Sequence, residues 1–128
     1  MARVFLVIGA LSGLLSVVLG AFAAHGLKQQ LSDSALQAFQ IGVQYQMYHA
    51  LALILAALLL MLQPAWTGLK ASGLAFILGA LLFSGSLYAL ALGGPRWLGP
   101  VTPLGGLSFM LGWLLFAVAV WRGKHQAG

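Results

Sequence analysis

Residues 4–27 read VFLVIGALSGLLSVVLGAFAAHGL, a run of 24 residues without a charged side chain between Arg3 and Lys28. An α-helix needs about 20 apolar residues to cross the hydrocarbon core of a bilayer. The run is therefore long enough to span a membrane as one helix. It decides the fold class because the rest of the chain repeats the same pattern.

Three more charge-free runs follow it. They lie between Asp33 and Lys70, between Lys70 and Arg96, and between Arg96 and Arg122, and they measure 36, 25 and 25 residues. Each can hold one membrane-spanning helix. We predict an all-α, integral membrane four-helix bundle that forms a single transmembrane domain over residues 1–128, with spans at about 4–25, 40–62, 71–92 and 104–121.

The composition excludes most other classes. Of 128 residues, 62% are hydrophobic and 5% are charged, whereas a soluble domain has about 25% charged residues. Membrane lipids are therefore the expected surroundings. The six basic residues are too scattered to follow a phosphate backbone, so we expect no nucleic-acid partner. Because the chain has no cysteine, disulfides and thiolate metal sites are excluded.

The first span has a competing interpretation. Arg3, the apolar run and the Ala21-Phe22-Ala23 triplet resemble a secretory signal peptide. The apolar run, however, is longer than the 7–15 residues typical of such a signal. We therefore expect this segment to be a helix of the mature protein.

The basic residues also predict an orientation. With four spans, Arg3, Lys70, Arg122 and Lys124 share one side of the membrane, and Lys28 and Arg96 lie on the other. Positively charged loops favour the cytoplasm. We predict a multi-pass protein of the bacterial inner (plasma) membrane with both termini in the cytoplasm.

Polar residues are concentrated before the second span, in SALQAFQIGVQYQMYHA (residues 34–50). On a helical wheel one face is apolar, and polar residues flank it on both sides. We predict an amphipathic segment at the membrane interface that continues into the second transmembrane helix. The apolar face is Leu36, Phe39, Val43, Met47 and Ala50; one polar flank is Gln37, Gln40, Gln44 and Tyr48, and the other is Gln46 and His49.

Polar groups at membrane depth usually face protein or water, because hydrocarbon offers them no partner. Those of the second span therefore need partners, and the third and fourth spans offer hydroxyl groups. The cluster is either a polar cavity or pathway, or a closed network that fixes helix packing. Its members are His25, Gln44, Gln46, Tyr48, His49, Ser84, Ser86, Tyr88 and Thr102.

The two histidines allow another interpretation, since two neutral imidazoles can bind haem iron or a divalent metal. No further ligand is apparent, because the chain has one aspartate and no glutamate. We expect no metal and no cofactor, and we expect His125 to be solvated. No catalytic residues are predicted, because a single acid provides neither a carboxylate pair nor a triad.

Small residues recur on the first span at Ser12, Ser16, Gly20 and Ala24, with Gly9 and Gly13 beside them. Such residues let transmembrane helices approach closely. We predict helix–helix contacts here and expect the protein to form a homo-oligomer.

Four segments resemble one known family. They are GAFAAHGL (20–27), GVQYQMYHAL (42–51), LFSGSLY (82–88) and TPLGG (102–106). In the same order they are similar to the membrane family called domain of unknown function 423, whose animal relatives look like transmembrane protein 256. Ala23 stands where that family usually has glycine, and Ile41 where it often has threonine. The resemblance implies a small multi-span inner-membrane protein and no particular activity.

The sequence thus favours a non-enzymatic bundle with a structural role, or one that binds lipid or a protein partner. One alternative is a transporter or channel for a small solute or for protons, with a polar cavity around His49. Another is a bis-histidine haem or metal protein that uses His25 and His49.

Overall fold

The computed structural model describes residues 1–123, so Lys124 and His125 lie outside the described residues. The chain forms α1 (Ala2–His25), α2 (Asp33–Leu62), α3 (Leu69–Gly79), the π-helical segment η1 (Ala80–Ser84), α4 (Gly85–Ala91), the 3₁₀ turn η2 (Arg96–Leu98) and α5 (Val101–Arg122). Because α3, η1 and α4 follow one another without a break, they form one long helix. Within residues 1–123, four helical segments are long and apolar enough to cross a membrane, which confirms the predicted four-helix membrane bundle.

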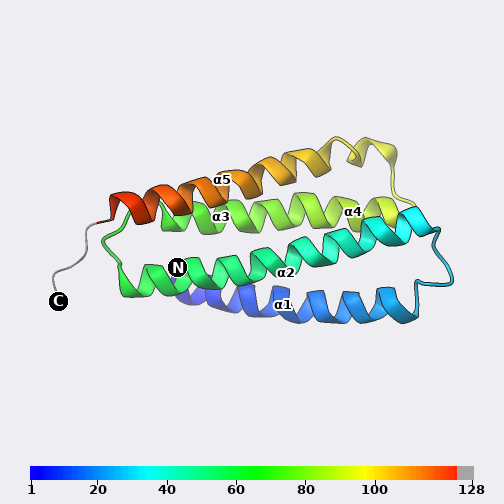
Figure 1. Ribbon diagram of the computed structural model, residues 1–128, viewed down its shortest axis with the longest axis horizontal. Helices are drawn as coiled ribbons and strands as arrows, with labels where there is room; N and C mark the ends of the chain where they lie inside the picture. The colour runs from blue at the N-terminus through cyan, green and yellow to red at the C-terminus, as the bar shows by residue number, and fades with distance from the viewer. Residues whose placement is uncertain (124–128) are drawn as a thin grey trace.

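The helices run antiparallel in chain order (Figure 1). α1 packs along α2, and α3 packs along α5, while α2 joins the two pairs through contacts with α3, η1 and α4. The N-terminus lies at the end of the bundle where α2 and α5 finish (Figure 1). α1 makes most of its contacts with the rest of the bundle through α2.

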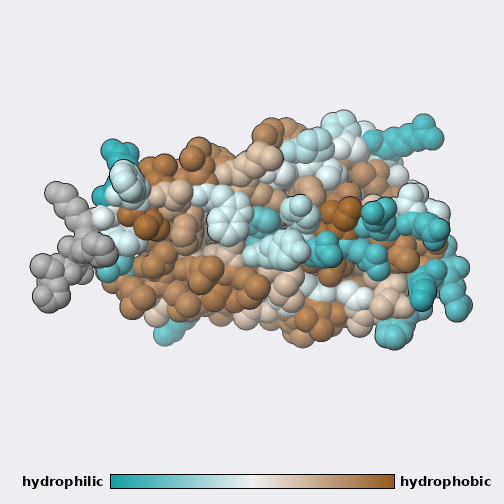
Figure 2. All heavy atoms as spheres, in the orientation of Figure 1, coloured by the Kyte–Doolittle hydropathy of each residue, from teal (hydrophilic) through white to brown (hydrophobic). Residues whose placement is uncertain are grey.

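The predicted amphipathic segment and the second span form one helix of 30 residues. Ser32 caps it, because its hydroxyl accepts a hydrogen bond of 3.2 Å from the Ala35 amide. A helix of this length measures about 45 Å, whereas the hydrocarbon core is about 30 Å thick. The first turns of α2 therefore extend beyond the hydrocarbon. Figure 2 shows hydrophilic residues along the N-terminal half of α2 and hydrophobic residues over most of the rest of the molecular face in view.

Small residues bring the helices together. A Cβ atom on Gly9 would lie 3.1 Å from the Ala50 carbonyl oxygen of α2, and one on Gly105 would meet the backbone of Phe83. Ser72 and Ser108 donate hydrogen bonds of 2.7 Å between α3 and α5, to the carbonyls of Gly112 and Ala75. The contacts are therefore close backbone approaches supported by short polar bridges.

The predicted small-residue face of α1 is only partly used. Gly9 and Ser16 are buried against the bundle, but Ala24 is exposed and the neighbouring Ala23 is buried in its place. The repeat of four used for the prediction drifts away from the helical period of 3.6 residues over three turns.

Candidate functional site

A chain of hydrogen bonds links three helices through Gln46. The Tyr88 hydroxyl of α4 donates to Gln46 Oε1 at 2.5 Å, and Gln46 Nε2 donates to the Ser12 carbonyl of α1 at 3.0 Å. The carbonyl of Ser12 can only accept, so this arrangement fixes which atom of the amide is nitrogen. Gln46 is 6% exposed, and it thereby connects α1, α2 and α4 inside the bundle.

His49 lies one turn further along α2 with both ring nitrogens hydrogen bonded. Trp113 Nε1 of α5 donates to His49 Nε2 at 3.0 Å, and His49 Nδ1 lies 2.7 Å from the Tyr45 carbonyl. An indole only donates, so Nε2 accepts and Nδ1 carries the proton. The ring also stacks on Phe109 with centroids 3.5 Å apart. His49 is therefore held as a neutral imidazole.

The two serines of the third span form separate bridges. Ser84 donates to the Gly42 carbonyl of α2 at 2.7 Å, and Ser86 shares a hydrogen bond with Thr102 at the start of α5. A Cβ atom on Gly42 would lie 2.7 Å from the Tyr88 ring. The predicted residues Gln46, His49, Ser84, Ser86, Tyr88 and Thr102 are thus joined in short hydrogen-bonded groups.

Three predicted site residues lie apart from these groups. Gln44 and Tyr48 are exposed on the outer side of α2, and His25 is exposed at the end of α1. His25 lies 13 residues beyond Ser12, about 20 Å along α1. α1 is antiparallel to α2 and Ser12 faces Gln46, so this direction leads away from His49. The two histidines therefore cannot bind one iron atom together.

Ser12 and Trp113 belong to the site but were not predicted. Each had a signal in the sequence. The indole N–H of Trp113 lies near the middle of the fourth span and needs a hydrogen-bond acceptor, which lipid does not provide. His49 lies at a similar depth on the second span and can be that acceptor. Ser12 was considered only as a small packing residue.

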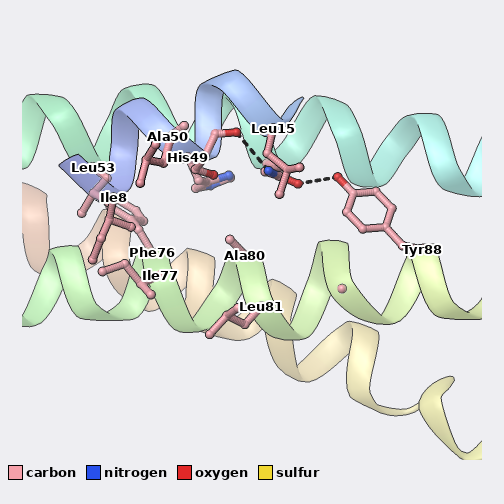
Figure 3. Close-up of a pocket in the computed structure, with 14 residues that line it drawn as sticks. Ile8, Leu15, His49, Ala50, Leu53, Phe76, Ile77, Ala80, Leu81 and Tyr88 are labelled. Atoms are coloured by element: carbon pink, nitrogen blue, oxygen red, sulfur yellow. Dashed lines mark hydrogen bonds between the residues drawn. The ribbon is translucent and has the colours of Figure 1, made fainter. Parts of the chain in front are cut away.

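A cavity of about 450 Å³ lies beside these hydrogen bonds, between α1, α2 and the helix α3–η1–α4. Leu11, Leu15 and Leu81 line it and are also exposed on the outside of the bundle, so the cavity opens sideways toward lipid. Figure 3 shows Ala80 and Tyr88 pointing into this region from the third span. The other lining residues are Ile8, Ser12, Gln46, His49, Ala50, Leu53, Phe76, Ile77 and Gly85.

The π-helical segment forms part of the cavity wall. The Gly85 amide reaches the Ala80 carbonyl five residues earlier, instead of four as in an α-helix. Ala80, Leu81 and Gly85 line the cavity, while Ser84 is turned inward onto α2. A Cβ atom on Gly85 would have no neighbour within 4 Å. Single π turns occur frequently at functional sites.

Comparison with known proteins identifies the family. Residues 19–106 match the family model described as a protein of unknown function, DUF423. The chain belongs to this family. The DUF423 chain is 44% identical over 117 residues to the UPF0382 membrane protein YwdK of Bacillus subtilis, covering 91% of this chain and 95% of the relative. It is 40% identical over 125 residues to the UPF0382 inner membrane protein YgdD of Escherichia coli K12, covering 98% of this chain and 95% of the relative.

These relatives confirm that the DUF423 chain is a membrane protein, as the resemblance implied. A further relative, the UPF0382 membrane protein of Haemophilus influenzae, is 40% identical over 124 residues, covering 97% of this chain and 98% of the relative. No solved structure matches the chain.

Proposed function

We propose that this DUF423 protein is a non-enzymatic membrane protein that binds a hydrophobic molecule from the bilayer. The cavity beside Gln46 and His49 is the observation that carries the proposal. Its volume of about 450 Å³ lies within the range of small-molecule sites, about 300–1,000 Å³. Most of its lining is aliphatic or aromatic, and its rim faces lipid. A ligand dissolved in the membrane could therefore enter sideways between α1 and α3–α4.

Other functions have less support from the geometry. Among residues 1–123, no group of three or more histidine and acidic side chains is placed to hold a metal, and both nitrogens of His49 already have partners. For transport, the side chains of Gln46, Ser84, Ser86 and Tyr88 bond in pairs or to backbone carbonyls. Such closed pairs fix helix packing and do not form a continuous polar path.

For location, we propose the bacterial inner membrane with both termini in the cytoplasm. The Escherichia coli relative is called an inner membrane protein, and this name and the distribution of basic residues support the proposal. Gly9 and Ser16 pack within the chain, so these two residues are not available for contacts between copies. Self-association stays a prediction.

The proposal is tested by filling the cavity. The protein is purified in mild detergent, and bound hydrophobic molecules are identified by native mass spectrometry and solvent extraction. We expect a molecule bound at close to one per chain, and we expect Ala80→Leu to remove it because the larger side chain occupies the cavity. Ala117→Leu is the matched control, since Ala117 is exposed on α5 away from the cavity.

Loss of the bound molecule in Ala80→Leu alone supports the proposal. Equal retention by both folded variants, or no bound molecule in the unmodified protein, would overturn it. Far-UV circular dichroism establishes that both variants keep their helices.

A further inference from the structure

The cavity has no charged lining residue. Among residues 1–123, the basic and acidic side chains lie at or beyond the helix ends: Arg3, Lys28, Asp33, Lys70, Arg96 and Arg122. A charge buried in an apolar site without a partner is strongly unfavourable. The cavity therefore selects against anionic head groups, such as a carboxylate or phosphate, and against ammonium groups.

The cavity also holds hydrogen-bond donors without acceptors. The Ser12 carbonyl accepts bonds from Ser16 and Gln46, but within residues 1–123 the Ser12 hydroxyl forms no hydrogen bond. A glutamine amide carries two N–H groups, and Gln46 donates one bond, to the Ser12 carbonyl. One hydroxyl and one N–H thus remain for a ligand. Ser12 is half-buried, and hydrocarbon offers its hydroxyl no acceptor, so an oxygen acceptor placed there is stabilised.

The donors are confined to one end of the cavity. Leu53 lies seven residues beyond Gln46 on α2, about 10 Å away along the helix. Around Leu53 the lining is apolar, with Ile8, Phe76 and Ile77 grouped beside it (Figure 3). A ligand with a polar head near Gln46 and an apolar chain running toward Leu53 matches this division.

We infer that the cavity binds an uncharged molecule with one long apolar chain, whose oxygen accepts hydrogen bonds from Ser12 and Gln46. This inference rests on the proposed function and adds the chemical class of the ligand. The oxygen is a carbonyl, ester or ether oxygen. It belongs either to a free membrane-soluble compound or to an ester group of a bulk phospholipid whose acyl chain enters from the side.

The experiment uses a methyl ester of a 16-carbon acid that carries a photoreactive diazirine on its chain. After illumination with the full-length protein in detergent, labelled peptides are mapped by mass spectrometry. We expect saturable labelling of α1, α2 and the third span. Unlabelled methyl palmitate should compete at least tenfold better than hexadecane, which has no acceptor, and than palmitate at pH 8, which is charged.

Variants then test the named donors. Ser12→Ala removes the free hydroxyl but no hydrogen bond within the protein, so it should fold normally and weaken ester binding about fivefold, the equivalent of one hydrogen bond. Ser34→Ala, at the exposed start of α2, is the matched control and should bind the ester unchanged. Hexadecane should bind equally to all three proteins.

A second preparation, in nanodiscs of diacyl phosphatidylcholine, separates the two sources. Labelling retained in nanodiscs supports a free compound, and labelling lost there supports a phospholipid ester; both agree with the inferred chemistry. Equal competition by hexadecane, stronger competition by palmitate, or an unchanged affinity in Ser12→Ala would overturn the inference but leave the proposed function intact. If no probe labels the cavity saturably, the proposed function itself fails.

Discussion

Trp113 of α5 donates a hydrogen bond from its indole nitrogen to Nε2 of His49 on α2, at 3.0 Å. The two residues are 64 positions apart in the chain. Their contact joins the α1–α2 pair to the α3–α5 pair, and it determines which ring nitrogen of His49 carries the proton. His49 also lines the cavity, so this bond holds part of the cavity wall.

Trp113→Phe should destabilise the bundle by about 1 kcal/mol, because His49 Nε2 loses its donor in an apolar environment. Thermal unfolding in detergent, followed by far-UV circular dichroism, measures the change. Trp121→Phe is the control, since Trp121 is almost fully exposed at the end of α5. Equal melting temperatures for the two variants would show that the bond contributes nothing.

Gln46 and Tyr88 should be energetically coupled. Gln46→Leu and Tyr88→Phe each break their hydrogen bond of 2.5 Å, so the double variant should lose less than the sum of the single losses. Coupling of about 0.5–1.5 kcal/mol is expected from comparable cycles in membrane proteins. Reversible unfolding in mixed detergent and SDS micelles provides the free energies.

The control for that cycle is Gln44→Leu, which replaces an exposed amide on the same helix. It should change the free energy of unfolding little, and combining it with Tyr88→Phe should give additive effects. Additivity in the Gln46 cycle itself would contradict the hydrogen bond.

Gly105→Ala should be strongly destabilising, by about 1–3 kcal/mol, because the new methyl group would meet the backbone of Phe83. Backbone atoms cannot move aside as a side chain can. Gly106→Ala is the neighbouring control, where the nearest atom would be 3.9 Å away. Melting temperatures of the two variants in detergent should therefore differ clearly, and similar values would disprove the close approach.

The proposed orientation can be tested with single cysteines, because the chain has none of its own. Gln29→Cys places one in the loop after α1, and Thr67→Cys places one in the loop before α3. Neither removes a charge. A membrane-impermeant maleimide applied to spheroplasts should label Gln29→Cys directly and Thr67→Cys only after lysis. The reverse pattern would place the termini outside the cytoplasm.

The spacing of charges was enough to predict the fold. Arg3, Lys28, Lys70, Arg96 and Arg122 separate apolar runs, and in lipid such a run has essentially one regular structure, the α-helix, that satisfies its own backbone. Helix ends were harder to place. α2 begins at Asp33, because the cap formed by Ser32 adds an interfacial part that hydropathy alone does not detect.

The apolar face of α2 describes only part of the buried side of this helix. Phe39 and Ala50 of that face are buried, and Gln46 and His49 are buried beside them. In a membrane, apolar side chains are stable against lipid, whereas buried amides and imidazoles require protein partners. Gln46 and His49 therefore turn inward. Gln44 and Tyr48 are exposed on α2, and hydrophilic residues gather on the N-terminal half of that helix (Figure 2).

The π segment has a consequence for related sequences of different length. The five residues Ala80–Ser84 form one wide turn, which holds one residue more than an α-helical turn. The residues after it are therefore shifted by one sequence position relative to an uninterrupted α-helix. A wide turn of this kind takes up one extra residue, so the helix after it still points Tyr88 at Gln46. Deleting one residue between Ala80 and Ser84 would leave a plain α-helix with the tyrosine on the same side. A relative that is one residue shorter in this segment would therefore keep the hydrogen bond between its tyrosine and its glutamine.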